Sequence, residues 1–432
     1  METYALPLGT KVPSLTELRR ERGLDALRTA ARVYDDERLA LETVGPAARY
    51  APLARSASAV APPPPATRSV AGGPVRYPDP ARTMSLAECA KGLGKSRKFY
   101  LKSRFAVCSG ASFVQTWLRN GRLSGRSMFN VRVIGTIPDN SRTITFRYYV
   151  TDVEKTGTTG ASGMPIRIKG QVAKSWPARA RYTHGGTIPA TARTFSQLGR
   201  LRTFTHTVRA APGGGRTAAD LVHAVYEPTV SITPTPGWTM GPGSTGGKLF
   251  LLAPRWDAAR YLGNATGGGK PANKGAATFS YTTALAYSGR PGAVERAVAL
   301  HIRDAYADPA ATKPPNTAKK LPGQSVKDPL HRLYTNTARR KANRAKAIAH
   351  CRAHFGAGYT AGGKQCDEFP FATTYEGCAQ KAYEKNAASN NCSVRPLVGG
   401  ENRNAGILLS QFYTKNRIID GYEDGFTMHV RS

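Results

Sequence analysis

Six cysteines fall into two groups, and this grouping limits how the chain can fold. Cys89 and Cys108 lie close together, and Cys351, Cys366, Cys378 and Cys392 lie near the C-terminus. None of them forms the C-x-x-C spacing that is typical of zinc ribbons or thioredoxin-like sites. An even number in each group predicts disulfides within two separate domains, and hence an oxidising compartment. Six reduced, buried cysteines in a cytosolic protein are the alternative.

The cysteine pattern therefore favours a secreted, extracellular protein. The opening METYALPLGTKVPSL has no basic stretch followed by an apolar one, as a secretory signal would have. We expect secretion nonetheless, with a misplaced start or a non-standard export route. No apolar run approaches the roughly 18 residues that a membrane-spanning helix needs, which argues against an integral membrane protein.

The charge of the chain indicates its partners. Lys and Arg number 62 against 28 Asp and Glu, which gives a formal net charge of +34 and a pI of about 10.3. Such a protein is attracted to polyanions, whether nucleic acid, acidic cell-wall polymer or an anionic membrane surface.

The 432 residues are enough for two or three domains. A capping box formed by Ser14 and Glu17 predicts a helix near the start. A run rich in Ala, Pro and Ser follows it and predicts an extended linker. We expect a flexible N-terminal segment with one helix and this linker (1–82), a basic β-rich domain (83–290), a helix and second linker (291–328), and a C-terminal domain (329–432).

The second of these segments has the pattern of short strands separated by Gly, Pro and Asn turns, which favours a sandwich-like or barrel fold. The expected strands are 112–118, 129–137, 143–151, 166–172, 202–209, 222–232 and 277–287. Its only acidic residues are Glu88, Asp139, Asp152, Glu154, Asp220, Glu227 and Asp257. With so few acids among many Lys and Arg, we favour a sequence-independent platform for a polyanion over ordinary solvated strand faces.

Two helices are expected further along, an amphipathic one over 294–306 and a longer one over 330–355. The longer helix carries a cluster of basic residues that are candidates for nucleic-acid binding: Arg339, Arg340, Lys341 and Arg344. A phosphate-facing helix and a charged outer face are both compatible with this pattern.

The stretch QCDEFPFATTYEGC (365–378) places several acids in an otherwise basic chain, among them Asp367, Glu368 and Glu376. A surface that attracts phosphates normally keeps carboxylates away, so a bound divalent cation is one reason for them. Mg²⁺ or Mn²⁺ prefers oxygen ligands and polarises a scissile phosphate. A second carboxylate can then accept a proton from the attacking water. Taken singly, these acids could equally be turn or cap residues.

A helix is expected over 402–414, with Asn402 as its cap. Asn402, Asn404 and Gln411 are candidate amide ligands, and Arg403 could hold a phosphate. A helix that presents such a group opposite an acidic strand end is the ββα-metal arrangement of many nonspecific nucleases.

Three motifs together resemble the NucA/NucB-type deoxyribonuclease domain of secreted bacterial nucleases. They are DEFPFATTYEG (367–377), ENRNAG (401–406) and NRIIDGYEDGF (416–426). The similarity covers roughly the last hundred residues, and the region upstream looks similar to the N-terminal part of long actinomycete proteins with this domain.

The resemblance implies metal-dependent cleavage of DNA with little sequence preference. It implies Asp367 as general base, Glu368 and Glu376 as acids near the metal, and an Asn-Arg step at Asn402 and Arg403. The candidate metal ligands are Glu368, Glu376, Asn402 and Gln411. The four C-terminal cysteines differ from the short family members and imply a disulfide that braces the site.

The sequence therefore predicts a multidomain protein, with a sandwich-like β-rich domain followed by a small α+β, ββα-metal-like nuclease domain. We expect a DNA endonuclease that uses Mg²⁺ or Mn²⁺, with RNA as an open alternative substrate. Two other hypotheses stay open at this point. One is a non-catalytic protein that binds DNA or acidic polymer and carries a degenerate nuclease domain. The other is a delivered antibacterial nuclease toxin with an inhibitor protein as partner.

Overall fold

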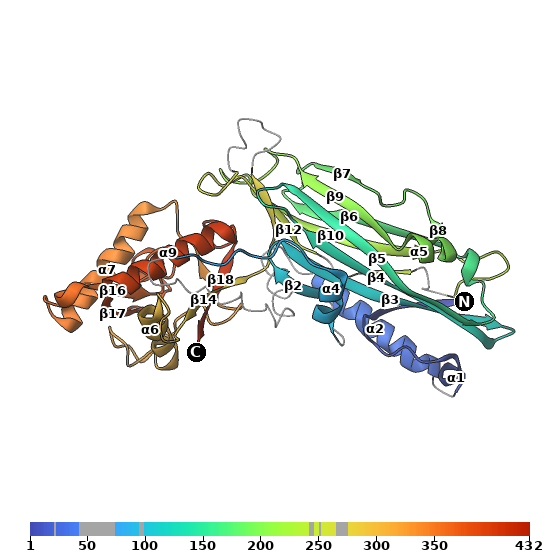
Figure 1. Ribbon diagram of the computed structural model, residues 1–432, viewed down its shortest axis with the longest axis horizontal. Helices are drawn as coiled ribbons and strands as arrows, with labels where there is room; N and C mark the ends of the chain where they lie inside the picture. Colours follow the sequence, from blue (N-terminus) through green and yellow to red (C-terminus); the bar gives the residue numbers. More distant parts are fainter. Residues whose placement is uncertain (21–22, 43–73, 95–98, 242–245, 250–251, 265–274) are drawn as a thin grey trace. The chain divides into compact units, whose positions relative to one another are not determined.

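A computed structural model describes residues 1–20, 23–42, 74–94, 99–241, 246–249, 252–264 and 275–432 (Figure 1). The chain divides into two compact units. Unit 1 comprises Met1–Ala59 and Ala81–Tyr281, and unit 2 comprises Val60–Pro80 and Thr282–Ser432. Within the described residues, no helix is long and apolar enough to cross a membrane.

Unit 1 contains an antiparallel sheet of seven strands. The order along this sheet is β1-β3-β4-β5-β9-β7, and β2 pairs with β3. The central strands alternate buried and more exposed residues, as expected for a sheet with one face toward a core. The strands are β1 (Glu2–Pro7), β2 (Phe99–Ser103), β3 (Ala106–Arg119), β4 (Arg122–Thr136), β5 (Thr143–Gly157), β7 (Tyr182–Gly186) and β9 (Thr203–Ala210).

A second sheet of six strands completes the β-structure of unit 1. Its order is β13-β12-β10-β6-β8, with β11 paired to β10. The two sheets meet through aromatic side chains, since the Phe146 ring of β5 stacks on the Tyr226 ring of β10 at 3.5 Å. The expected β-rich region is thus confirmed. The strands are β6 (Pro165–Trp176), β8 (Arg193–Thr194), β10 (Val222–Ile232), β11 (Gly246–Lys248), β12 (Pro254–Asp257) and β13 (Ala276–Phe279).

Unit 1 also contains the helices α1 (Leu15–Leu18), α2 (Gly23–Glu42), α4 (Leu86–Leu93) and α5 (Phe195–Leu201), with the 3-10 turn η1 (Ala161–Gly163). The predicted capping box is present at the start of α1, where Ser14 and Glu17 each bond to the other's backbone N–H. The strand β1 was not predicted, because its pairing partner β3 lies about a hundred residues away in sequence. The Pro/Ala linker falls mostly on residues 43–73, outside the described residues.

Unit 2 combines a three-stranded sheet, a two-stranded hairpin and helices. In the sheet, β14 (Thr283–Ser288) runs parallel to β18 (Gly425–Arg431), which pairs antiparallel with β15 (Leu330–His331). The hairpin is formed by β16 (Lys364–Phe369) and β17 (Ser393–Val398). The helices are α6 (Arg296–Ala307), α7 (Thr337–Phe355), α8 (Gln380–Tyr383) and α9 (Gly399–Lys415), with the 3-10 turn η4 (Ala361–Gly363).

One apolar core joins most of these elements of unit 2, and a smaller one, which includes Ala347 and Val394, packs α7 on the hairpin. Phe412 of α9 lies beside Phe426 of β18, with ring centroids 5.4 Å apart. Ile302 of α6 and Leu285 of β14 belong to the same core. Tyr77, from the segment 74–80, packs edge-on against Phe412 at 5.4 Å. Burial of such side chains is the main term that stabilises the unit.

Two expected elements have different bounds in the structure. The run expected as one strand over 277–287 is divided between β13 and β14, and the boundary between the units falls at 281/282. The helix expected over 330–355 begins only at Thr337, where the Asn336 side chain accepts from the Arg339 N–H as an N-cap. Residues 330–331 pair with β18 instead. The predicted domain boundaries at 82, 290 and 328 stay predictions.

Candidate active site

Strand β16 holds Asp367 in a buried position, with only 5% of the residue exposed. Its Oδ2 lies 2.5 Å from Nδ1 of His301 on α6. The other ring nitrogen, Nε2, lies 2.7 Å from Oγ of Ser393 on β17. Three elements that are distant in sequence thus converge on one carboxylate.

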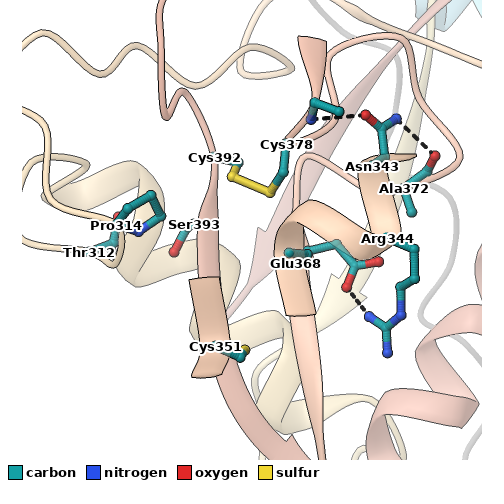
Figure 2. Close-up of a disulfide and its surroundings, with 12 residues drawn as sticks. Thr312, Pro314, Asn343, Arg344, Cys351, Glu368, Ala372, Cys378, Cys392 and Ser393 are labelled. Atoms are coloured by element: carbon teal, nitrogen blue, oxygen red, sulfur yellow. Dashed lines mark hydrogen bonds and ion pairs between the residues drawn. A yellow bond between two sulfur atoms is a disulfide. The ribbon is translucent and has the colours of Figure 1, made fainter. Parts of the chain in front are cut away.

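Glu368 points the opposite way from Asp367, as neighbouring residues of a strand must. It forms an ion pair with Arg344 of α7 (Figure 2). The same guanidinium donates from Nη1 to the carbonyl of Cys366 at 2.6 Å. Burial raises the pKa of Glu368 to about 7, and the nearby Asp367 adds to this, while Arg344 works against it. The burial effect exceeds that of the ion pair, which is the expected balance where a carboxylate loses most of its water.

Asp367 and Glu368 nevertheless border the same cavity, whose volume is about 290 Å³. Its walls come from β14, α6, α7, α9, the segment 332–334, the end of β16 and the turn that follows β16. Apolar side chains such as Phe371 and Leu409 form part of them. The charged lining residues are Arg332, Arg340, Asp367 and Glu368, and the polar ones are Tyr287, Tyr334, Thr373, Asn402, Ser410 and Tyr413. Carboxylates, cations and an amide around one hollow are the groups that would meet a phosphodiester and its counter-ion.

The turn after β16 is fixed by Asn343 of α7, a fully buried amide. Its Nδ2 donates to the carbonyls of Ala372 and Thr374, and its Oδ1 accepts from the N–H of Ala379 (Figure 2). Because every bond goes to backbone, Asn343 sets the path of the turn that carries the cavity wall.

Two disulfides brace the same region, where the difference from the short family members implied one. Cys351 of α7 is bonded to Cys366, the residue just before Asp367, and Cys378 is bonded to Cys392, just before Ser393. The third joins Cys89 to Cys108 in unit 1. Disulfides within two separate parts of the chain are thus confirmed.

Residues 324–427 match the family model described as Deoxyribonuclease NucA/NucB. The C-terminal region is a NucA/NucB deoxyribonuclease domain. The recognition made from the three sequence motifs is therefore confirmed, and the match supports a nuclease that acts on DNA. No curated protein matches the chain.

The matched residues of the NucA/NucB domain leave out part of the site. His301 and the whole of α6 precede residue 324, as does β14, the parallel partner of β18. Sequence reasoning missed His301, although one signal was available. It is the single polar residue on the buried face that Val298, Ile302 and Ala305 form at helical spacing.

Two residues proposed as metal ligands of the NucA/NucB domain are engaged elsewhere. Both carboxylate oxygens of Glu376 bind His331, one at its N–H (3.0 Å) and one at Nδ1 (2.7 Å). The Gln411 amide donates to the carbonyl of Val75 at 2.9 Å and accepts from the N–H of Tyr77 at 2.6 Å. Neither is among the described residues that line the cavity. Both side chains therefore hold chain segments together in this structure.

Of the other predicted residues, some line the cavity and others lie outside it. Asn402 lines the cavity, and its Nδ2 lies 3.3 Å from Oε1 of Gln365. Its neighbour Arg403 is exposed on α9. Of the basic residues on α7, Arg340 lines the cavity and Lys341 is exposed. Arg339 is buried and binds the carbonyl of Tyr375 and the carboxylate of Glu384, so it stabilises the fold.

The donor set at the cavity fits a divalent cation with few protein ligands. Within the residues that the structure describes, no three His, Cys, Asp or Glu side chains gather as a metal-binding group. The carboxylates of Asp367 and Glu368 and the amide of Asn402 do border one hollow. Mg²⁺ in nucleic-acid enzymes commonly takes one or two carboxylates, with water and substrate phosphate completing its shell.

Proposed function

We propose that this protein is a metal-dependent, sequence-nonspecific endonuclease that hydrolyses the phosphodiester bonds of DNA. The observation that carries the proposal is the pair of adjacent carboxylates, Asp367 and Glu368, at one cavity of a NucA/NucB domain. In a chain of net charge +34, acids at a phosphate-binding hollow are otherwise unfavourable.

In this proposal Asp367 is the general base. An ionised carboxylate has two oxygens, and His301 engages only one of them, Oδ2. The other is left to accept the proton of a water that attacks the phosphorus. A positioned base of this kind contributes about 10²- to 10⁴-fold to a hydrolysis rate.

Glu368 and Asn402 would hold the cation, since both residues line the cavity and both side chains carry oxygen atoms that can act as ligands. When bound, a divalent ion polarises the scissile phosphate and offsets the charge that builds on the leaving oxygen. The ion pair with Arg344 keeps the Glu368 carboxylate in one orientation. Glu376 and Gln411 stay outside this assignment because their polar atoms are already bound.

Basic and aromatic residues at the cavity would orient the DNA. Arg332 and Arg340 both lie over the ring of Tyr334, at 5.0 and 5.3 Å from its centroid. Arg340 can meet a phosphate while the half-exposed Tyr334 ring offers a face to a base. Arg403, exposed beside Asn402, would contact the backbone further along the strand.

We also propose that unit 1 holds the polyanion without reading its sequence. Each of its acids between residues 83 and 281 is in an ion pair with Lys or Arg. The remaining cations are therefore not offset by acids of this region. Several are exposed along β5 and β6 and beside α5: Arg147, Arg167, Lys169, Lys174, Arg193, Arg200 and Arg202. Contacts of this type hold the DNA backbone and weaken steeply with salt.

Export is part of the proposal, because the protein has three disulfides, and disulfides form and persist mainly in oxidising compartments. Free secretion and delivery as a toxin are both compatible with it. An inhibitor protein that binds the NucA/NucB domain would distinguish delivery from free secretion.

The test uses the full chain and supercoiled plasmid. The purified protein is treated with EDTA, dialysed, and assayed alone and with Mg²⁺ or Mn²⁺ added back. We expect cleavage only with a divalent ion, first to nicked and linear DNA and then to a smear without discrete bands. DNA binding without cleavage under every ion would contradict the enzyme and favour a binding protein.

A further inference from the structure

His301 uses both of its ring nitrogens inside the protein. It is completely buried, with Nδ1 at 2.5 Å from Asp367 and Nε2 at 2.7 Å from Ser393. An ionised carboxylate can only accept hydrogen bonds, so Nδ1 is the donor to Asp367. The Ser393 hydroxyl then meets the opposite side of the ring and prevents it from turning. Asp367 is thus hydrogen-bonded to a histidine whose own orientation is fixed by Ser393.

The helix that carries His301 is firmly attached to the NucA/NucB domain. The N–H of Ala297 donates to Glu401 of α9 at 2.5 Å, and Asp304 forms an ion pair with Arg395 of β17 at 3.0 Å. Val298 and Ile302 lie in the shared apolar core. These contacts fix α6 at both ends and along one face, so the position of His301 is set by the fold.

His301 is separated from the substrate. It is not among the described residues that line the cavity, whereas Asp367 is. A direct part in the reaction is therefore excluded for a ring with no exposed surface. What it can do is fix which oxygen of Asp367 faces the cavity and in which direction, since misplacing a reacting group by about 1 Å can cost about 100-fold in rate.

We infer that His301 is a positioning residue for the general base, so that the working nuclease extends upstream of the matched region 324–427 to include α6. This inference rests on the proposed function, in which Asp367 is the base. Ser393 has a supporting role in this inference. Its hydroxyl fixes the orientation of the His301 ring, and the ring in turn fixes the carboxylate of Asp367.

The test compares two conservative variants of the full chain. His301→Asn places an amide N–H where Nδ1 was, so it can still donate to Asp367. His301→Gln places its amide near the position of Nε2, so it can still bond Ser393 but not Asp367. The measurements are kcat and KM for DNA cleavage, the affinity for DNA in EDTA, and the melting temperature.

We expect His301→Gln to lower kcat about 100-fold with KM and DNA affinity near those of the wild type. We expect His301→Asn to stay within about 10-fold of the wild type, because one hydrogen bond to the base is kept. A role in folding alone would lower the melting temperature of both variants alike and leave kcat of the folded fraction unchanged. That result would overturn the inference.

A Ser393 variant and the cleavage rate of the wild type complete the test. If the His301 variants do not fold, Ser393→Ala removes only the hydroxyl that locks the ring, and we expect kcat to fall several-fold at unchanged KM. A wild-type kcat in folded Ser393→Ala would contradict the inference. If the wild type cleaves but His301→Gln cleaves equally well, the inference fails while the proposed function stands. If the wild type does not cleave DNA with any of the ions tested, both the proposed function and the inference fail.

Discussion

Arg344 of α7 and Glu368 of β16 form an ion pair on the side of the strand opposite to His301. The two adjacent acids are thus each fixed by a different helix. Arg344 also reaches the carbonyl of Cys366, so one guanidinium secures both the side chain and the backbone of the strand. The sequence makes Arg344 a candidate for nucleic-acid binding, and its contacts in the structure give it a role in building the site.

This role predicts a specific kinetic change in Arg344→Lys. Lysine keeps the charge but lacks the planar guanidinium, whose Nη1 donates to both the Glu368 carboxylate and the Cys366 carbonyl. We expect kcat to fall by about 10-fold, the equivalent of one charged hydrogen bond, with KM little changed. Steady-state cleavage of a fluorescent duplex measures both. A rise in KM at constant kcat would indicate instead that Arg344 contacts DNA.

Tyr334 gives the opposite prediction, because it lies at the cavity with 37% of its surface exposed. Stacking of a base on an aromatic ring contributes about 1–3 kcal/mol. We therefore expect Tyr334→Ala to raise KM by about 10-fold without a comparable loss of kcat. Tyr334→Phe keeps the ring and is the matched control, expected to behave as the wild type. Equal effects in both variants would mean that the hydroxyl, not the ring face, matters.

The Cys351–Cys366 disulfide predicts that stability and activity fall together in unit 2. It closes a loop with a sequence separation of 15, which corresponds to about 3 kcal/mol in the chain-entropy account. Because Cys366 precedes Asp367, we expect the double variant Cys351→Ala/Cys366→Ala to lose cleavage at a lower temperature than the wild type.

The matched control for that experiment is Cys89→Ala/Cys108→Ala in unit 1, with a separation of 19. All four tryptophans of the chain, Trp117, Trp176, Trp238 and Trp256, belong to unit 1, so their fluorescence reports its unfolding alone. We expect the control to shift the fluorescence transition and to leave cleavage at room temperature unchanged. The reverse pattern would contradict the assignment of each disulfide to its unit.

Unit 1 is predicted to lose stability in acid through His206. Burial, with a smaller effect of His184, lowers the pKa of His206 to about 4 from its usual 6.5. The unfolded chain binds the proton first, so the free energy of unfolding is retained above pH 6.5 and falls as the pH drops toward 4. We expect His206→Gln to show a smaller drop in the tryptophan melting temperature between pH 8 and pH 4.5. The difference in melting temperature between the two proteins at pH 8 is the baseline. If the melting temperatures of both proteins fall in parallel as the pH drops, the prediction is wrong.

The local parts of the structure were predictable from sequence. The strand expected over 222–232 has the bounds of β10, and the capping box at Ser14 is formed as predicted. Asp367 and Glu368 were identified from their position in a motif, and both border the cavity. These features depend on neighbouring residues, whose periodicity and turn chemistry the sequence displays directly.

The tertiary parts were not predictable in this way. Gln411 looked like a free amide on a helix, but it is occupied by residues 75–77, far away in the chain. His301 is 66 positions before the carboxylate that it holds. No periodicity connects such pairs, because the contact depends on how α6, α9 and the hairpin pack around one core.

The most direct test of the central claim is the cleavage rate of Asp367→Asn in the full chain. Asparagine preserves the size of the side chain and can still accept a hydrogen bond from His301, but it cannot take up a proton from water. With Mg²⁺ or Mn²⁺ present, we expect plasmid cleavage to fall by about 10²- to 10⁴-fold, with DNA affinity and melting temperature close to those of the wild type. Cleavage at the wild-type rate by a folded Asp367→Asn protein would contradict it.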